Sequence, residues 1–138
     1  MFIFNLDSMA VTKFSHIVNL DIYHRSILFS FGYKIEELKE YIETKFNCNL
    51  DELYLDKFKN ASGLTIDEIC YPDVIIWMPK IPVSNFEYSS LQHEISHAVI
   101  SILESLEIEI NVKNSEAFCY LQGYITMEIY RKLSSIER

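Results

Sequence analysis

Residues 85–106 contain the strongest structural pattern in the chain. Apolar residues recur in this segment at the spacing of one helix face, namely at Leu91, Ile95, Ala98, Val99, Ile102 and Leu106. Neither glycine nor proline interrupts the segment. The pattern predicts one long helix that begins at Asn85 or Glu87, ends at Leu106 and buries a single face.

The first part of the chain predicts strands and then helices. Residues 14–31 are rich in β-branched and aromatic side chains, and they predict one long strand or two paired strands ended by Gly32. Residues 34–46 repeat apolar side chains at a helical spacing. Residues 49–58 predict a short helix capped by Asn49.

Two further strands are predicted before the long helix. Residues 63–69 and 73–79 have the composition of strands, and a hairpin that turns at Tyr71-Pro72 would join them. Pro79 and Pro82 stop the second of these strands, which makes it a candidate for the edge of the sheet.

The chain after the long helix predicts one more helix. Residues 108–112 form either a short strand or an extended link, and Ser115 is the expected cap of a helix from Glu116 to about Leu133. The order of elements predicts an α+β fold in one domain over residues 1–138, with a small sheet and its helices on one side.

Composition and charge exclude several classes of function. The chain has 20 acidic and 12 basic residues and a formal charge of −8, whereas binding to nucleic-acid phosphates needs a basic surface. No apolar stretch approaches the 18 or so residues of a membrane span. The three cysteines, an odd number without CxxC spacing, are typical of a reducing compartment. We therefore expect a cytoplasmic protein, in its own cell or in an infected host cell, without a nucleic-acid or membrane partner.

The predicted long helix carries HEISH at residues 93–97, an H-E-x-x-H pattern. His93 and His97 lie one turn apart on the same side of that helix, away from the centre of its apolar face. Two imidazoles at this spacing can direct ring nitrogens at one zinc ion about 2.0–2.1 Å away. Glu94 projects beside the pair, where it can act on a metal-bound water without binding the metal. The alternative is a helix whose polar face carries two histidines by chance.

A catalytic zinc site needs a third protein ligand and one open position for water. Glu116 follows His97 by nineteen residues and stands at the start of the next predicted helix. The connection is long enough to return that helix antiparallel beside the first, so Glu116 can complete a His₂Glu set. The other downstream acids are less well placed, because they lie on the first helix, just after it, or near the far end of the second.

These motifs support a resemblance to a known family. With HEISH followed by NSEA at residues 114–117, the chain resembles the gluzincin group of zinc metallopeptidases, of which thermolysin is the familiar member. It is also similar to small phage-encoded proteins in which an H-E-x-x-H helix precedes an S/D-E-A helix ending in G-Y. The similarity covers about residues 73–127. It implies a minimal zincin-like domain, in which a small sheet packs against the H-E-x-x-H helix and a second helix that carries a ligand.

The resemblance also implies roles for individual residues. His93, His97 and Glu116 would bind Zn²⁺, and Glu94 would take a proton from the metal-bound water and deliver it to the leaving amine. Residues 73–79 occupy the place of the edge strand that, in zincins, pairs with an extended substrate. Mn²⁺, Co²⁺ or Fe²⁺ would accept the same ligands.

The chain departs from the gluzincin pattern one turn after the glutamate ligand. The family has an aspartate there that orients a zinc histidine, whereas this chain has Tyr120. A phenol supplies no negative charge. Tyr120 and Tyr124 are the nearest candidates for stabilising the oxyanion of a tetrahedral intermediate, and ordinary packing is an equally strong interpretation of both.

The expected function is therefore a zinc metallopeptidase that hydrolyses peptide bonds in a peptide or protein substrate. One alternative is a non-catalytic binding protein that keeps the zincin scaffold and docks a host or virion protein. Another is a zinc hydrolase that acts on a different kind of amide. The oligomeric state remains open.

Overall fold

The computed structural model describes residues 10–50, 61–67 and 71–136. In chain order the elements are β1 (Phe14–Leu20), the 3₁₀ turn η1 (Asp21–Tyr23), β2 (Arg25–Phe31), α2 (Ile35–Lys45), β3 (Leu64–Ile66), β4 (Val74–Met78), α4 (Asn85–Ser105) and α5 (Ser115–Ser134). The mixed α+β class is confirmed. The helix predicted at 49–58 lies almost entirely outside the described residues.

The four strands form one sheet in the order β1-β2-β4-β3. β1 and β2 are antiparallel, β4 runs parallel to β2, and β3 runs antiparallel to β4. The prediction that residues 73–79 form the edge strand is wrong, because β4 has a neighbour on each side. Pro79 follows the last residue of β4, so it removes no hydrogen-bond donor from the ladder. Among the described strands, the short β3 is the last on that side.

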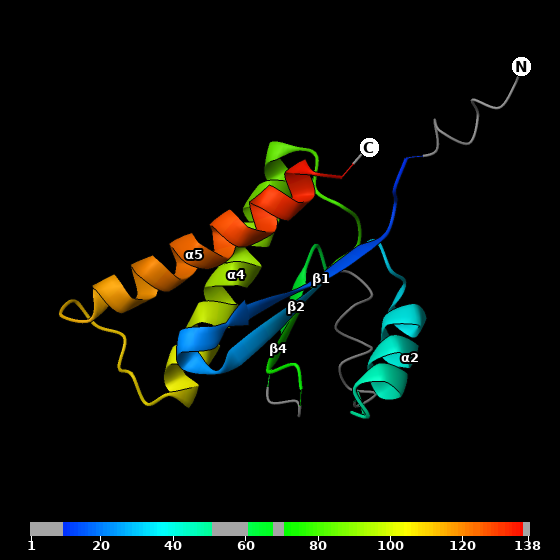
Figure 1. Ribbon diagram of the computed structural model, residues 1–138. Coiled ribbons are helices and arrows are strands. Elements are labelled where there is room, and N and C mark those ends of the chain that lie inside the picture. The colour runs from blue at the N-terminus through cyan, green and yellow to red at the C-terminus, as the bar shows by residue number, and fades with distance from the viewer. Residues whose placement is uncertain (1–9, 51–60, 68–70, 137–138) are drawn as a thin grey trace, which may run out of the picture.

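Helices cover both faces of the sheet, with α4 and α5 on one face and α2 on the other (Figure 1). The side chains of β4 alternate between the two layers: Val74, Ile76 and Met78 join the α4–α5 core, whereas Ile75 and Trp77 join the α2 cluster. Because both faces of β4 are covered, its sequence is continuously apolar. The expectation that all helices lie on one side is therefore wrong.

The predicted long helix is confirmed over almost its whole length. α4 buries one face against the sheet and α5, through Leu91, Ile95, Ala98, Val99, Ile102 and Leu103. The start of α4 is capped by Ser84, whose hydroxyl accepts a hydrogen bond from the Glu87 backbone N–H. The Glu87 carboxylate in turn accepts from the backbone N–H of Ser84, so the two residues form a capping box that fixes where the helix begins.

Glu87→Gln should make the protein less sensitive to acid. Hydrogen bonds from Lys80 and from the Ser84 backbone lower the pKa of Glu87 from 4.5 to about 2. A depressed pKa in the folded state adds stability above about pH 4.5, and that contribution is lost as the pH falls towards 2. We expect urea unfolding of Glu87→Gln to show a smaller loss of unfolding free energy between pH 5 and pH 2 than the wild type. An unchanged loss would contradict this assignment, and Glu40→Gln, at an exposed site on α2, is the control.

Gly32→Ala should destabilise the fold. Gly32 follows β2 with a φ of +82°, and an added Cβ would lie 2.0 Å from the backbone oxygen of Thr12. We expect a loss of at least about 1 kcal/mol of unfolding free energy, measured by urea denaturation. Gly123→Ala is the matched control, because its site in α5 has no heavy atom within 4 Å of the added Cβ. In a helix interior this change should stabilise by up to about 1 kcal/mol, and equal effects of the two changes would contradict the argument.

The connection between α4 and α5 contains no strand, so the link interpretation of residues 108–112 is confirmed. The prediction that Ser115 caps α5 is wrong by one position. Asn114 is at the N-cap, and the Ser115 hydroxyl donates to the backbone oxygen of Val112 at 3.1 Å.

Among the described residues, no helix is both long and apolar enough to cross a membrane.

Cys48 is disulfide-bonded, whereas Cys119 is an exposed free thiol. Because disulfides form mainly in oxidising compartments, the cysteine count no longer favours a reducing one. The compartment stays a prediction.

Candidate active site on α4 and β3

α4 holds His93 and His97 together on its exposed side. The two Nε2 atoms lie 3.1 Å apart, with the ring planes at 77° to each other. In a tetrahedral zinc site with bonds of about 2.0–2.1 Å, two ligand nitrogens are separated by about 3.3 Å. The pair therefore has the spacing of two ligands on one ion.

Glu94 lies beside the histidines, on the side of α4 that faces β3. Only 8% of its surface is exposed. Its Oε1 accepts a hydrogen bond from the Thr65 hydroxyl at 2.8 Å, and its backbone oxygen lies 3.0 Å from the same hydroxyl. A nearly buried carboxylate is thus held at the edge of the histidine pair.

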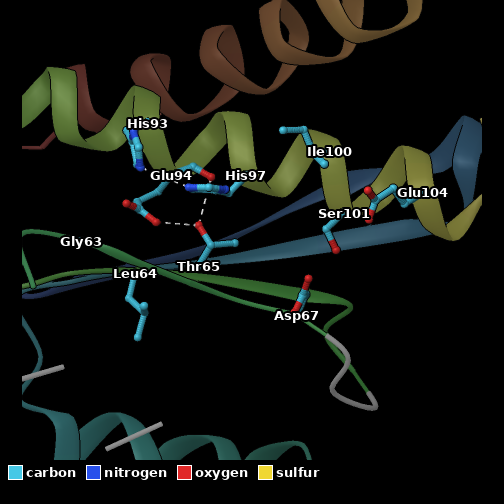
Figure 2. Close-up of a pocket in the computed structure, with 10 residues that line it drawn as sticks. All are labelled: Gly63, Leu64, Thr65, Asp67, His93, Glu94, His97, Ile100, Ser101 and Glu104. Carbon is cyan, nitrogen blue, oxygen red and sulfur yellow. Dashed lines mark hydrogen bonds between the residues drawn. The ribbon is translucent and has the colours of Figure 1, made fainter. Parts of the chain in front are cut away.

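These side chains open into a cleft of about 400 Å³ between α4 and β3 (Figure 2). Its lining comes from both walls: Gly63, Leu64, Thr65, Asp67, His93, Glu94, His97, Ile100, Ser101 and Glu104. A second hollow shares Asp67, Ser101 and Glu104 with it and continues to Arg25. The two hollows therefore adjoin each other along α4.

Glu116 does not join the histidines. Among the described residues, no group of three or more histidine, cysteine or acidic side chains is arranged to hold a metal ion. His93 and His97 therefore provide two possible ligands for a zinc ion. Glu116, the expected third ligand, does not lie beside them.

The packing of α5 on α4 explains where Glu116 lies. Gln122 donates to the Ser96 hydroxyl at 3.0 Å, and Gln92 donates to Thr126 at 3.1 Å. These bonds make the helices antiparallel and place Gln122 beside the residue that precedes His97. Glu116 is six residues earlier, or about 9 Å along the helix axis at 1.5 Å per residue. Figure 1 shows α5 diverging from α4 towards this end.

Tyr120 and Tyr124 do not line the histidine cleft, and their role as oxyanion donors stays a prediction. Each is two residues from Gln122, and about 200° of helix rotation turns both away from α4. They line a separate hollow with η1, made by Leu20, Asp21, Ile22, Tyr23, Tyr120, Leu121 and Tyr124.

The contribution of β3 to this site was not predicted from the sequence. Thr65 and Gly63 lie beside Glu94, although nothing in the H-E-x-x-H motif points to them. The sequence of residues 64–66, LTI, does carry one indication of it, because the polar Thr65 stands between two apolar residues. Leu64 and Ile66 pack with the α2 cluster, so Thr65 faces the opposite layer, where α4 lies.

Comparisons with protein-family models, curated proteins and solved structures found no match to this chain.

Proposed function

We propose that this protein is a metal-dependent hydrolase of peptide bonds, in which His93 and His97 would supply two of the ligands of a zinc ion and Glu94 would be the general base. The observation that carries the proposal is the 3.1 Å separation of the two Nε2 atoms next to a buried, hydrogen-bonded carboxylate in one cleft. A bound zinc ion would supply a water of lowered pKa and a polarised scissile carbonyl.

Glu94 carries out the proton transfers in this proposal. Its carboxylate takes a proton from the attacking water as the water oxygen bonds to the carbonyl carbon. It then gives that proton to the amine nitrogen as the carbon–nitrogen bond breaks. The position of Glu94 beside the two imidazoles, rather than between them, suits a base that stays outside the ligand set.

The geometry of β3 favours a peptide over other amides. β3 is the last strand of the described sheet, and Leu64 and Thr65 line the cleft. The unpaired backbone groups of a terminal strand can hydrogen-bond an extended peptide. A peptide bound in this way would cross the cleft beside His93 and Glu94.

A paired measurement tests the proposal. The purified protein should contain zinc near one equivalent per chain by mass spectrometry, and it should cleave members of a peptide library. Chelation should remove both the metal and the cleavage, and added zinc should restore both. A protein that neither retains nor takes up zinc would contradict the proposal.

A second candidate is a binding protein that keeps this scaffold without catalysis. It is favoured by the apolar side chains at the hollow between η1 and α5, where Ile22 is 84% exposed and Tyr120 is 75% exposed. Such side chains on a surface mark protein-binding sites when they form a contiguous patch. Zinc bound without any turnover, together with loss of partner binding in Ile22→Ser, would favour this candidate over the hydrolase.

A further inference from the structure

Thr65 is the polar side chain that β3 directs at Glu94. The Thr65 hydroxyl lies 2.8 Å from the Glu94 carboxylate oxygen Oε1 and 3.0 Å from the Glu94 backbone oxygen. The two residues are 29 positions apart in sequence, so the contact links β3 to the helix that carries the histidines. Figure 2 shows the hydroxyl between the strand and the helix, at the wall of the cleft.

The position of Thr65 is fixed by the sheet. Thr65 pairs with Ile76 of β4, and Ile76 is fully buried in the α4–α5 core. The neighbours Leu64 and Ile66 pack on the opposite face of the sheet. Because successive side chains of a strand point to opposite faces of the sheet, the Thr65 side chain faces α4.

Gly63 allows β3 to come this close to Glu94. A Cβ at Gly63 would lie 2.8 Å from Met78 Sδ and 3.0 Å from Glu94 Cγ. The backbone at Gly63, just before β3, thus lies close to the stem of the Glu94 side chain, while the Thr65 hydroxyl donates to the Glu94 carboxylate. Together they restrict the rotamers that Glu94 can adopt.

We propose that Thr65 is the positioning residue of the general base. Its hydroxyl holds the Glu94 carboxylate in the orientation needed to meet the attacking water, and it ties that carboxylate to the strand that binds the peptide. The inference rests on the proposed hydrolase function. A base displaced by about 1 Å can cost about 100-fold in rate, so the contact matters more for turnover than for substrate affinity.

Thr65→Val and Thr65→Ser test this role. Valine has nearly the same shape as threonine but no hydroxyl, whereas serine keeps the hydroxyl. We expect Thr65→Val to lower kcat by about 10- to 100-fold with KM within about twofold, while zinc content is unchanged. Thr65→Ser should recover most of the lost kcat. Thr44→Val, at an exposed site on α2, should behave as wild type.

A double variant separates positioning from general weakening of the fold. In a Glu94→Gln background the base is already absent, so adding Thr65→Val should cause little further loss of residual activity. A wild-type kcat in Thr65→Val, an equal loss in Thr65→Ser, or a change confined to KM would overturn the inference and leave the hydrolase proposal standing. Wild-type protein that binds zinc but cleaves no peptide would overturn both, because there would then be no base to position.

Discussion

We expect Glu94→Gln to abolish the proposed peptide cleavage without removing the proposed zinc ion. The substitution preserves the shape of the side chain, and the amide oxygen can still accept the hydrogen bond from Thr65. It removes the group that accepts a proton, and loss of a general base costs about 10²- to 10⁴-fold in rate. The fold should be little affected, since the hydrogen bond between Thr65 and this side chain is retained.

Three measurements on the Glu94→Gln protein check this expectation: kcat on a cleaved peptide, zinc content by mass spectrometry, and the midpoint of urea unfolding. Glu40→Gln, at an exposed site on the opposite layer of the molecule, controls for the loss of one negative charge. Zinc lost together with activity would mean that Glu94 is a ligand and that the roles are assigned wrongly. Full activity would remove Glu94 from the mechanism.

Replacing either histidine should have the second large effect. Because His93 and His97 are the two nitrogen donors with the spacing of zinc ligands, His93→Ala and His97→Ala should each weaken zinc binding by more than about 100-fold. This loss exceeds the 10- to 100-fold decrease in metal affinity that is typical when a residue that hydrogen-bonds to a metal ligand is replaced. The measurement is a competition titration against a chelator of known affinity.

The same competition titration, applied to Glu116→Gln, tests whether Glu116 is a zinc ligand. The resemblance to gluzincins implies a loss comparable with that of a histidine, whereas the register of α5 on α4 keeps Glu116 away from the pair. From the structure we expect zinc affinity within about threefold of wild type, since no direct metal bond is removed. His24→Asn is the histidine control, because His24 has a φ of 53° and asparagine tolerates that conformation. Equal zinc binding by all four variants would contradict the assigned site.

The helix and its histidine pair could be predicted from the sequence because both depend on local geometry. The spacing of Leu91, Ile95 and Ile102 sets the buried face of α4, and the four-residue interval between the histidines sets their separation. Neither property needs any knowledge of the neighbouring elements.

The position of Glu116 could not be predicted, because it depends on the axial register of α5 against α4. Counting nineteen residues from His97 fixes the length of the connection but not the register of α5. That register follows from polar pairs such as Gln122 with Ser96, which look like ordinary surface residues in the sequence. The same contacts turn Tyr120 away from the cleft.

The arrangement of the sheet also depends on partners far along the chain. The apolar run of β4 fits an interior strand covered on both faces, yet the two prolines that follow it favoured an edge. Neither proline lies within β4, since Pro79 comes after Met78, so neither removes a hydrogen-bond donor from the strand. β3 has only three residues, and its importance for Glu94 becomes visible only when β3 is placed beside α4.

X-ray diffraction at the zinc absorption edge, from crystals grown with the metal, tests the central claim most directly. The account predicts an anomalous peak bonded to Nε2 of His93 and Nε2 of His97 at about 2.0–2.1 Å, with the Glu94 carboxylate close by but not bonded. A fully zinc-loaded crystal with no peak at these two nitrogens, or with its peak at other side chains, would contradict it.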